Sequence, residues 1–398
     1  FDKTKAILAG TLTRVGTMAA VDAIVSLPAL PANDLKKFWP TGVASGARAW
    51  ITTNMRDGIY RDATVSLTAR LPIEGDNAGK LIVDSVKGRM NIAGVTVDYL
   101  NPMAPLKNVL ATATFSENRF DLAVQSGNVG ELLLDEGVVA ISGIGSGSDN
   151  LALTASIQGP VRSALDMAAH PRLDLLSKMG LNIEGAAGTH TTRLALRFPL
   201  TQALRAEEIR VKSVSDIKGL ALANVLKGRG VTDGTVTLTV DNDTMTAKGT
   251  ARYAGTAADF EWRQDLTSSD NVATRISAKA TLNTKLLESL DSKIQDRIDG
   301  PLPINLVYER RRNKSETFSA GLNLTDANFT LPGFEWTKAA GKRATAEIAV
   351  LMKDGEITAI PDLRIDAGAL KAAVKGTFSP GKKGTHRGLS APEIGAGS

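Results

Sequence analysis

The stretch Asp62–Leu71, DATVSLTARL, decides the fold class because apolar and polar residues alternate along it without a break. One side of an extended chain carries Ala63, Val65, Leu67 and Ala69, and the other side carries Thr64, Ser66, Thr68 and Arg70. A period of two residues is typical of a β-strand with one dry face and one wet face. The stretch therefore predicts a half-buried strand.

The same alternation recurs in His190–Leu200, Thr235–Val240 and Ala344–Leu351. β-Branched residues and threonine dominate these runs, as is usual in strands. Because one face of each strand must be dry, we expect the apolar positions to share one concave face of a continuous sheet. The candidates for that face are Val65, Leu67, Leu194, Leu196, Val236, Leu238, Ile348 and Val350.

Turn signals separate the runs at intervals of about 10 to 14 residues. Asp57-Gly58, Asp233-Gly234, Asp354-Gly355 and the tip Asp241–Asp243 all favour tight reversals. A parallel sheet would need a helix between successive strands, and the sequence lacks such helices. The pattern predicts a mainly all-β chain, folded as a long, curved antiparallel sheet with a few short connecting helices.

Four segments break the alternation and predict helices. Asn33–Phe38 and Ser45–Asn54 are short, with Asn33 and Ser45 as candidate N-caps. Val161–Gly180 and Asn283–Asp299 have apolar residues at helical spacing, and we expect them to be the longest helices.

The spacing of these helices suggests a repeated unit of one multi-stranded sheet and one helical connection. Successive helical segments begin roughly 125 residues apart. We therefore expect three β-groove modules: residues 1–160 with short helices near 33–54, residues 161–282 opened by a helical segment, and residues 283–398, an incomplete module opened by a helix.

Composition excludes several classes of protein. Of 398 residues, 43% are hydrophobic and 22% are charged, which excludes a disordered chain and a polytopic membrane protein. The absence of cysteine removes disulfides, thiolate metal sites and cysteine nucleophiles. The net charge of +5 comes from interspersed charges, whereas nucleic-acid binding calls for a concentrated basic stripe.

No motif in the chain carries enzymatic chemistry. Gly376–Lys383 resembles a phosphate-binding loop, but Lys383 stands where a magnesium-binding Ser or Thr is required. His170, His190 and His386 have no metal-ligand spacing. We therefore expect no enzyme, no catalytic residue, no metal and no cofactor. The charged run Glu309–Lys314 is expected to be a solvated hairpin tip, with contact to anionic headgroups as the alternative.

An apolar sheet face must be covered by another sheet, by helices or by a ligand. A few helical segments cannot cover roughly eighteen strands. Acyl chains would fit an open apolar groove. Two alternatives remain open: a non-enzymatic β-sandwich scaffold or adhesion module of the cell envelope, and an enzyme domain on a β framework.

Two longer stretches resemble signatures of the YhdP branch of the AsmA-like superfamily. In Leu30–Arg61, LPANDLKKFWPTGVASGARAWITTNMRDGIYR, the matching residues are Phe38, Trp39, Pro40, Arg48, Trp50, Asn54 and Gly58. In Gly321–Lys338, GLNLTDANFTLPGFEWTK, they are Leu324, Thr325, Asp326, Ala327, Trp336 and Lys338. Phe198–Leu200 and Ala258–Trp262 fit as well, in the family's order.

The resemblance implies a bridge-like lipid-transfer protein of the Gram-negative envelope. Such proteins are anchored in the inner membrane, cross the periplasm, and carry phospholipids along a hydrophobic β-groove toward the outer membrane. It implies phospholipids as ligands, partners among outer-membrane or periplasmic proteins, and no nucleic acid. The present sequence lacks the family's N-terminal membrane anchor, so we expect it to be a segment of a longer protein.

Overall fold

The computed structural model describes residues 5–39, 45–144, 146–176, 183–201, 204–226, 229–267, 271–282, 298–331, 336–353, 356–368 and 370–377. Within these ranges the chain forms twenty-three strands but only three α-helices and two short 3₁₀ turns. Twenty strands belong to one hydrogen-bonded sheet, and three short ones form a second. Every pairing for which the register is resolved is antiparallel, so the predicted all-β antiparallel fold is confirmed.

The chain divides into two compact units. Unit 1 comprises Phe1–Gly180 and His190–Val214, and unit 2 comprises Leu181–Thr189 and Ser215–Ser398. The division falls within β10 (Ala187–Pro199) and β11 (Arg210–Leu226). The three-module boundaries expected from the helix spacing remain a prediction.

Unit 1 is a meander in which each long strand pairs with the next. The order is β1, β2, β4, β5, β6, β7, β8 and β9, with the short β3 beside β5. The strands are β1 (Ile7–Val15), β2 (Met18–Pro31), β3 (Met55–Arg56), β4 (Ile59–Pro72), β5 (Ile82–Val97), β6 (Leu106–Ser116), β7 (Arg119–Val129), β8 (Leu132–Ser142) and β9 (Asn150–Pro160).

Unit 2 repeats this plan. The long strands pair in the order β12, β13, β14, β15, β17, β18, β21, β22 and β23. They are β12 (Arg229–Asp241), β13 (Thr244–Tyr253), β14 (Thr256–Asp265), β15 (Val272–Leu282), β17 (Leu302–Arg311), β18 (Ser315–Asn323), β21 (Thr345–Lys353), β22 (Glu356–Ala367) and β23 (Leu370–Thr377). The small sheet consists of β16 (Ile298–Asp299), β19 (Asn328–Leu331) and β20 (Trp336–Lys338).

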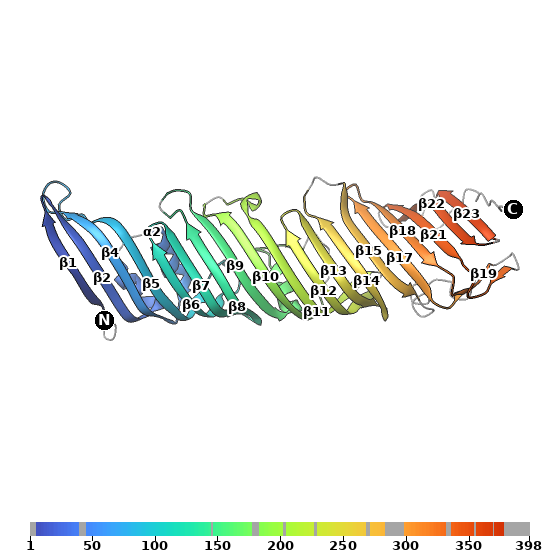
Figure 1. The fold of residues 1–398 in the computed structure, drawn as a ribbon, viewed down its shortest axis with the longest axis horizontal. Coiled ribbons are helices and arrows are strands. Elements are labelled where there is room, and N and C mark those ends of the chain that lie inside the picture. Colours follow the sequence, from blue (N-terminus) through green and yellow to red (C-terminus); the bar gives the residue numbers. More distant parts are fainter. Residues whose placement is uncertain are drawn as a thin grey trace. The chain divides into compact units, whose positions relative to one another are not determined.

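The helices between β2 and β4 form where the sequence predicts them. The 3₁₀ turn η1 (Ala32–Asp34) leads into α1 (Leu35–Phe38), and α2 (Ser45–Asn54) follows. Asn33 is not an N-cap: it lies inside η1, and its side-chain oxygen accepts the backbone N–H of Asp57 at 3.2 Å. In Figure 1, α2 lies against one face of the sheet, beside β5 and β6.

The two longer predicted helices differ from the structure. The helix α3 (Val161–Ala169) ends eleven residues before the predicted Gly180, at His170, because Pro171 cannot continue a helix. Residues 283–297 lie outside the described ranges, and Ile298–Asp299 forms β16 instead of a helix end. A second 3₁₀ turn, η3 (Ala206–Glu208), precedes β11.

Most described turns follow the sequence signals. Asp57 and Gly58 both have positive φ between β3 and β4, and the charged run at residues 309–314 spans the β17–β18 hairpin tip. Asp233-Gly234 is the exception. Asp233 has a φ of 54°, but it lies within β12, where the register with β13 shifts. The dipeptide therefore forms a β-bulge instead of a chain reversal.

Among the described residues, no helix is long and apolar enough to cross a membrane.

Candidate functional site

The register of unit 1 places the apolar positions of neighbouring strands on one face, because directly paired residues of an antiparallel sheet point to the same side. Val65 of β4 pairs with Val25 of β2. Leu67 pairs with Ala23 on one side and with Val86 of β5 on the other. Continuing through β9, the apolar face of unit 1 comprises Val21, Ala23, Val25, Ala63, Val65, Leu67, Ala69, Val86, Met90, Ile92, Ala111, Ala113, Phe115, Phe120, Leu122, Val124, Val139, Ile141, Leu151, Leu153 and Ala155.

The apolar face of unit 2 arises in the same way. Val236 pairs with Gly249, and Leu238 pairs with Ala247. The face comprises Val236, Leu238, Ala247, Phe260, Trp262, Ile276, Ala278, Leu306, Tyr308, Phe318, Ala320, Ile348, Val350, Leu363, Ile365, Ala372 and Val374. The candidates Ile348 and Val350 therefore belong to the same face as Val236 and Leu238.

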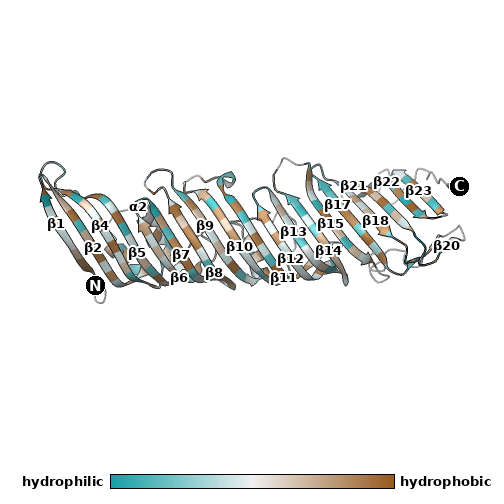
Figure 2. Cartoon of the chain, viewed as in Figure 1, coloured by the Kyte–Doolittle hydropathy of each residue, from teal (hydrophilic) through white to brown (hydrophobic). Residues whose placement is uncertain are grey.

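The opposite face of each unit is polar and wet. Thr64, Ser66 and Thr68 are exposed in unit 1, and Thr237 and Lys248 are exposed in unit 2. Figure 2 shows the consequence as alternating hydrophobic and hydrophilic bands along the strands. The remaining candidates, Leu194 and Leu196, follow the same rule on β10, where they are half-buried between the exposed Arg193 and Arg197.

Helices cover only one part of the apolar face of unit 1. Leu35 and Phe38 of α1 pack against a cluster that includes Tyr60, Ile92 and Ala111. Tyr60 is 1% exposed, and burial raises the pKa of its hydroxyl to about 12. This end of the face is therefore a closed core.

One side chain, that of Arg48, joins these two helices. Arg48 of α2 donates through Nε to the carbonyl of Trp39 at 2.8 Å and through Nη2 to the carbonyl of Lys36 at 3.0 Å. Both acceptors lie at the end of α1. The signature arginine thus fixes α1 against α2.

A buried lysine plays the corresponding part in unit 2. Lys338 is 4% exposed, and its Nζ donates to the carbonyls of Leu324, Thr325 and Ala327 at 2.6 to 2.7 Å. The three bonds satisfy all three protons of the ammonium group. They fasten β20 to the turn that follows β18, next to the small core that includes Leu302 and Leu324. The second family signature therefore has a structural explanation.

Away from these covered ends, most side chains of both apolar faces are only half-buried. Seven strands at about 4.8 Å spacing, with about 20 Å of apolar length each, give unit 1 a face on the order of 700 Å². That total includes the part under the helix-covered cluster, and the open remainder is comparable in size to the largest apolar patch of a typical monomer, roughly 300–600 Å². A sandwich would need a second sheet of similar size, and within the described residues the other sheet has three short strands.

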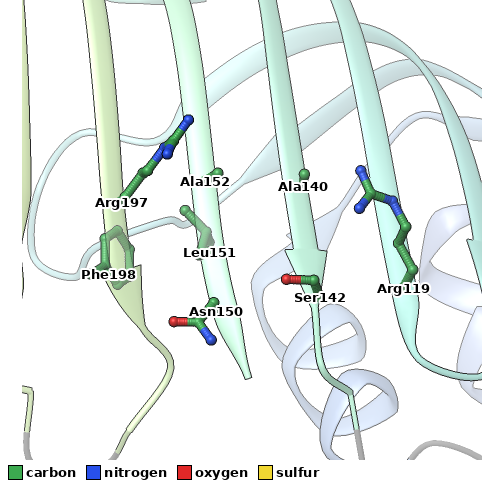
Figure 3. Close-up of a pocket in the computed structure, with 8 residues that line it drawn as sticks. All are labelled: Arg119, Ala140, Ser142, Asn150, Leu151, Ala152, Arg197 and Phe198. Carbon is green, nitrogen blue, oxygen red and sulfur yellow. The ribbon is translucent and has the colours of Figure 1, made fainter. Parts of the chain in front are cut away.

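A shallow hollow of about 300 Å³ lies on the polar face of unit 1 (Figure 3). Arg119 of β7, Ser142 of β8 and Asn150 of β9 are register partners that line it, with Arg197 of β10 beside them. The Arg119 guanidinium is paired with Asp121 at 2.6 Å. Most of the residues that line the hollow belong to the polar face, although Leu151 of the apolar face also lines it, and we do not take the hollow as the candidate site.

The histidines do not form a catalytic arrangement in the described part of the chain. His190 is 8% exposed, its Nδ1 lies 2.8 Å from the hydroxyl of Thr192, and burial lowers its pKa. His170 lines a hollow of about 340 Å³ together with Ser163, but its Nδ1 accepts the backbone N–H of Arg172. The Ser163 hydroxyl donates instead to Glu131, at 2.6 Å.

Two other sequence features fall largely outside the described residues. His386 and most of Gly376–Lys383, from residue 378 onward, lie outside the described residues. Within the described ranges, no group of three or more His, Asp or Glu side chains could hold a metal ion.

The sequence analysis missed most of the apolar faces. Met90 and Ile92 of β5 alternate with polar residues as Val65 and Leu67 do, whereas Leu151 and Leu153 of β9 are separated by the apolar Ala152. Following the alternation through every strand would have found Met90 and Ile92. Bulges obscure the pattern in β5, where the register shifts near Gly94.

Comparison with known proteins agrees with this geometry. No curated protein and no solved structure matches the chain. The family model described as YhdP protein matches residues 6–376, which is nearly the whole chain. The chain therefore belongs to the YhdP family.

Proposed function

We propose that this chain is a segment of a bridge-like lipid-transfer protein whose apolar faces carry the acyl chains of phospholipids between the inner and outer membranes. Membership of the YhdP family supports a general role in lipid transport of the AsmA-like kind. The observation that carries the finer proposal is the apolar face of each unit. It runs through seven paired strands in unit 1, and a separate one runs through nine paired strands in unit 2, without a second sheet of similar size among the described residues.

The proposed mechanism is passive. Each buried CH₂ group contributes about 0.8 kcal/mol, so exposing two acyl chains of about 16 carbons to water costs about 25 kcal/mol. A continuous apolar surface removes that barrier, because the chains exchange one dry contact for the next. The headgroups stay in water at the edge of the sheet, as burial of an ionised group is costly.

In this proposal the chain makes and breaks no covalent bond. The polar contacts of His170 and His190 support this. Nδ1 of His170 accepts a backbone N–H, and Nδ1 of His190 contacts the hydroxyl of Thr192. The proposed location is the periplasm, with the longer protein anchored in the inner membrane. The sandwich alternative has less support, because the described residues provide no second sheet of similar size.

The experiment that tests the proposal is mass spectrometry of lipids that remain bound to the chain after gentle purification. We expect two-chain phospholipids in near-stoichiometric or higher amounts. Purification of folded protein with no bound phospholipid, and no uptake from phospholipid micelles, would contradict the proposal.

A further inference from the structure

The apolar face of unit 2 ends in a row of polar side chains on four adjacent strands. Gln264 of β14 pairs with Thr274 of β15, which pairs with Arg310 of β17. Arg310 pairs in turn with Glu316 of β18. We call Gln264, Thr274, Arg310 and Glu316, together with the hydroxyl of Tyr308, the polar belt.

The polar belt lies on the apolar face and not on its reverse. The next register row contains Trp262, Ile276, Tyr308 and Phe318, which belong to the apolar face. Two residues along a strand span about 7 Å, so the belt lies one such step from aromatic and aliphatic side chains. A molecule that rests its chains on the apolar row would therefore place its polar end at the belt.

Internal hydrogen bonds shape most of the belt. Thr274 is 7% exposed and donates to Oε1 of Gln264 at 2.8 Å. The Tyr308 hydroxyl donates to Oε1 of Glu316 at 2.8 Å. Burial, followed by this contact, raises the pKa of Tyr308 to about 12, so the hydroxyl keeps its proton. The Glu316 carboxylate is thus held in a fixed orientation with its second oxygen unused by this bond.

Arg310 differs from its neighbours because the described residues provide its side chain with no hydrogen bond and no ion pair. On the reverse face of the same strands, Arg275 is paired with Glu309. At the nearby hairpin tip, Arg312 is paired with Asp265 at 2.5 Å. Arg310 is exposed, so its guanidinium is available to an anion from solution.

The belt therefore offers one free cation directly across from one oriented carboxylate. Side chains directly opposite each other in an antiparallel pair have Cβ atoms about 5 Å apart. The phosphate and the ammonium group of a phosphoethanolamine headgroup are separated by a comparable length, an ester oxygen and two carbons. A guanidinium binds phosphate through charge-assisted hydrogen bonds, and a carboxylate binds an ammonium group.

We propose that the polar belt is a headgroup site for zwitterionic phospholipids, in which Arg310 binds the phosphate and Glu316 binds the ammonium group. The inference rests on the proposed function, because it assumes that acyl chains occupy the adjacent apolar row. It adds a selectivity that a purely apolar groove would lack: an amine-bearing headgroup is favoured over an anionic one.

The test equilibrates the whole chain with non-ionic micelles that contain equal amounts of phosphatidylethanolamine and phosphatidylglycerol. Lipids retained after detergent removal are then counted per protein by mass spectrometry. We expect the wild type to favour phosphatidylethanolamine by about fivefold, the value of one charged contact of about 1 kcal/mol near water. Glu316→Gln should bring the ratio close to one by lowering retained phosphatidylethanolamine about fivefold while leaving retained phosphatidylglycerol unchanged.

Arg310→Gln should lower retention of both lipids by about fivefold, because both carry a phosphate. Since Arg310 is exposed, this variant gives an answer even if Glu316→Gln fails to fold. Arg275→Gln, one residue row away on the reverse face, is the matched control and should change neither quantity. If the wild type retains lipid, but Glu316→Gln and Arg310→Gln change neither the lipid ratio nor the amount of lipid retained, the headgroup site alone is overturned. Absence of any retained lipid in the wild type would overturn the proposed function and the headgroup site with it.

Discussion

A carboxylate placed on the open part of the apolar face should impair lipid binding without unfolding the protein. Leu67 is half-buried, and its register partners Ala23 and Val86 belong to the face outside the helix-covered cluster. Full burial of a leucine contributes about 1.5–3 kcal/mol, so loss of a half-buried one costs about 1–1.5 kcal/mol. Because the new carboxylate stays partly hydrated, Leu67→Asp should destabilise the fold by about 1–2 kcal/mol in total.

The same substitution in the covered part of the face provides the calibration. Ile92 is 3% exposed and belongs to the closed core with Tyr60. Ile92→Asp buries an unpaired charge and should cost more than about 4 kcal/mol. Ser66→Asp, beside Leu67 on the exposed polar face and paired with Lys87, should cost less than about 0.5 kcal/mol.

Urea unfolding followed by circular dichroism measures the three free energies, and phospholipid retention measures function. We expect Leu67→Asp to lower retention and Ser66→Asp to leave it unchanged. If Leu67→Asp were as destabilising as Ile92→Asp, the face would be a closed core and the sandwich would be favoured. Normal stability with unchanged retention would refute a role of this position in lipid binding.

Three further predictions concern the supports of the sheet. Lys338→Met leaves three carbonyls without their donor and should lower the free energy of unfolding in urea by about 3 kcal/mol. Lys338→Arg should be destabilised as well, because a planar guanidinium cannot replace the ammonium group. Wild-type stability of Lys338→Arg would contradict this role of the ammonium group. Asp265 has a pKa lowered to about 2, mainly by its bond with the Thr267 hydroxyl, so its stabilisation is present above about pH 4 and is lost as pH falls through 2. The melting temperature of Asp265→Asn should therefore lie below that of the wild type at pH 6 and match it near pH 2; a gap that persists at pH 2 would exclude this charge as the cause. Gly249→Val should lower the free energy of unfolding by about 2 kcal/mol or more, because a Cβ would collide with the carbonyl of Thr235 across the β12–β13 pair. An unchanged melting temperature would show that the two strands can move apart to accept the side chain.

The strand content and the parity of the apolar faces could be predicted from sequence because alternation is a local property. The run at residues 62–71 encodes its own dry face, and the register later aligns that face with its neighbours. Local signals did not predict the structure where one short sequence is compatible with two backbone conformations. Asp233-Gly234 suits both a hairpin turn and a bulge, and only the pairing of β12 with β13 selects the bulge.

Other features depend on contacts between residues far apart in sequence. Nothing local shows that Lys338 will reach three carbonyls eleven to fourteen positions earlier, or that Arg48 will join two helices. Arg310 and Glu316 pair within the β17–β18 hairpin, but the complete polar belt also needs β14 and β15 in register with it. In sequence both residues look like ordinary polar ends of a hairpin.

The most direct test of the central claim uses the absence of cysteine from the natural sequence. Single cysteines introduced as Val65→Cys and Ser66→Cys can each carry a benzophenone, one on the apolar face and one on the polar face of the same strand. After incubation with phospholipid and illumination, intact-protein mass spectrometry should detect phospholipid adducts at position 65 and few or none at position 66. Equal labelling at both positions, or labelling at neither, would contradict the account that acyl chains lie on the apolar face.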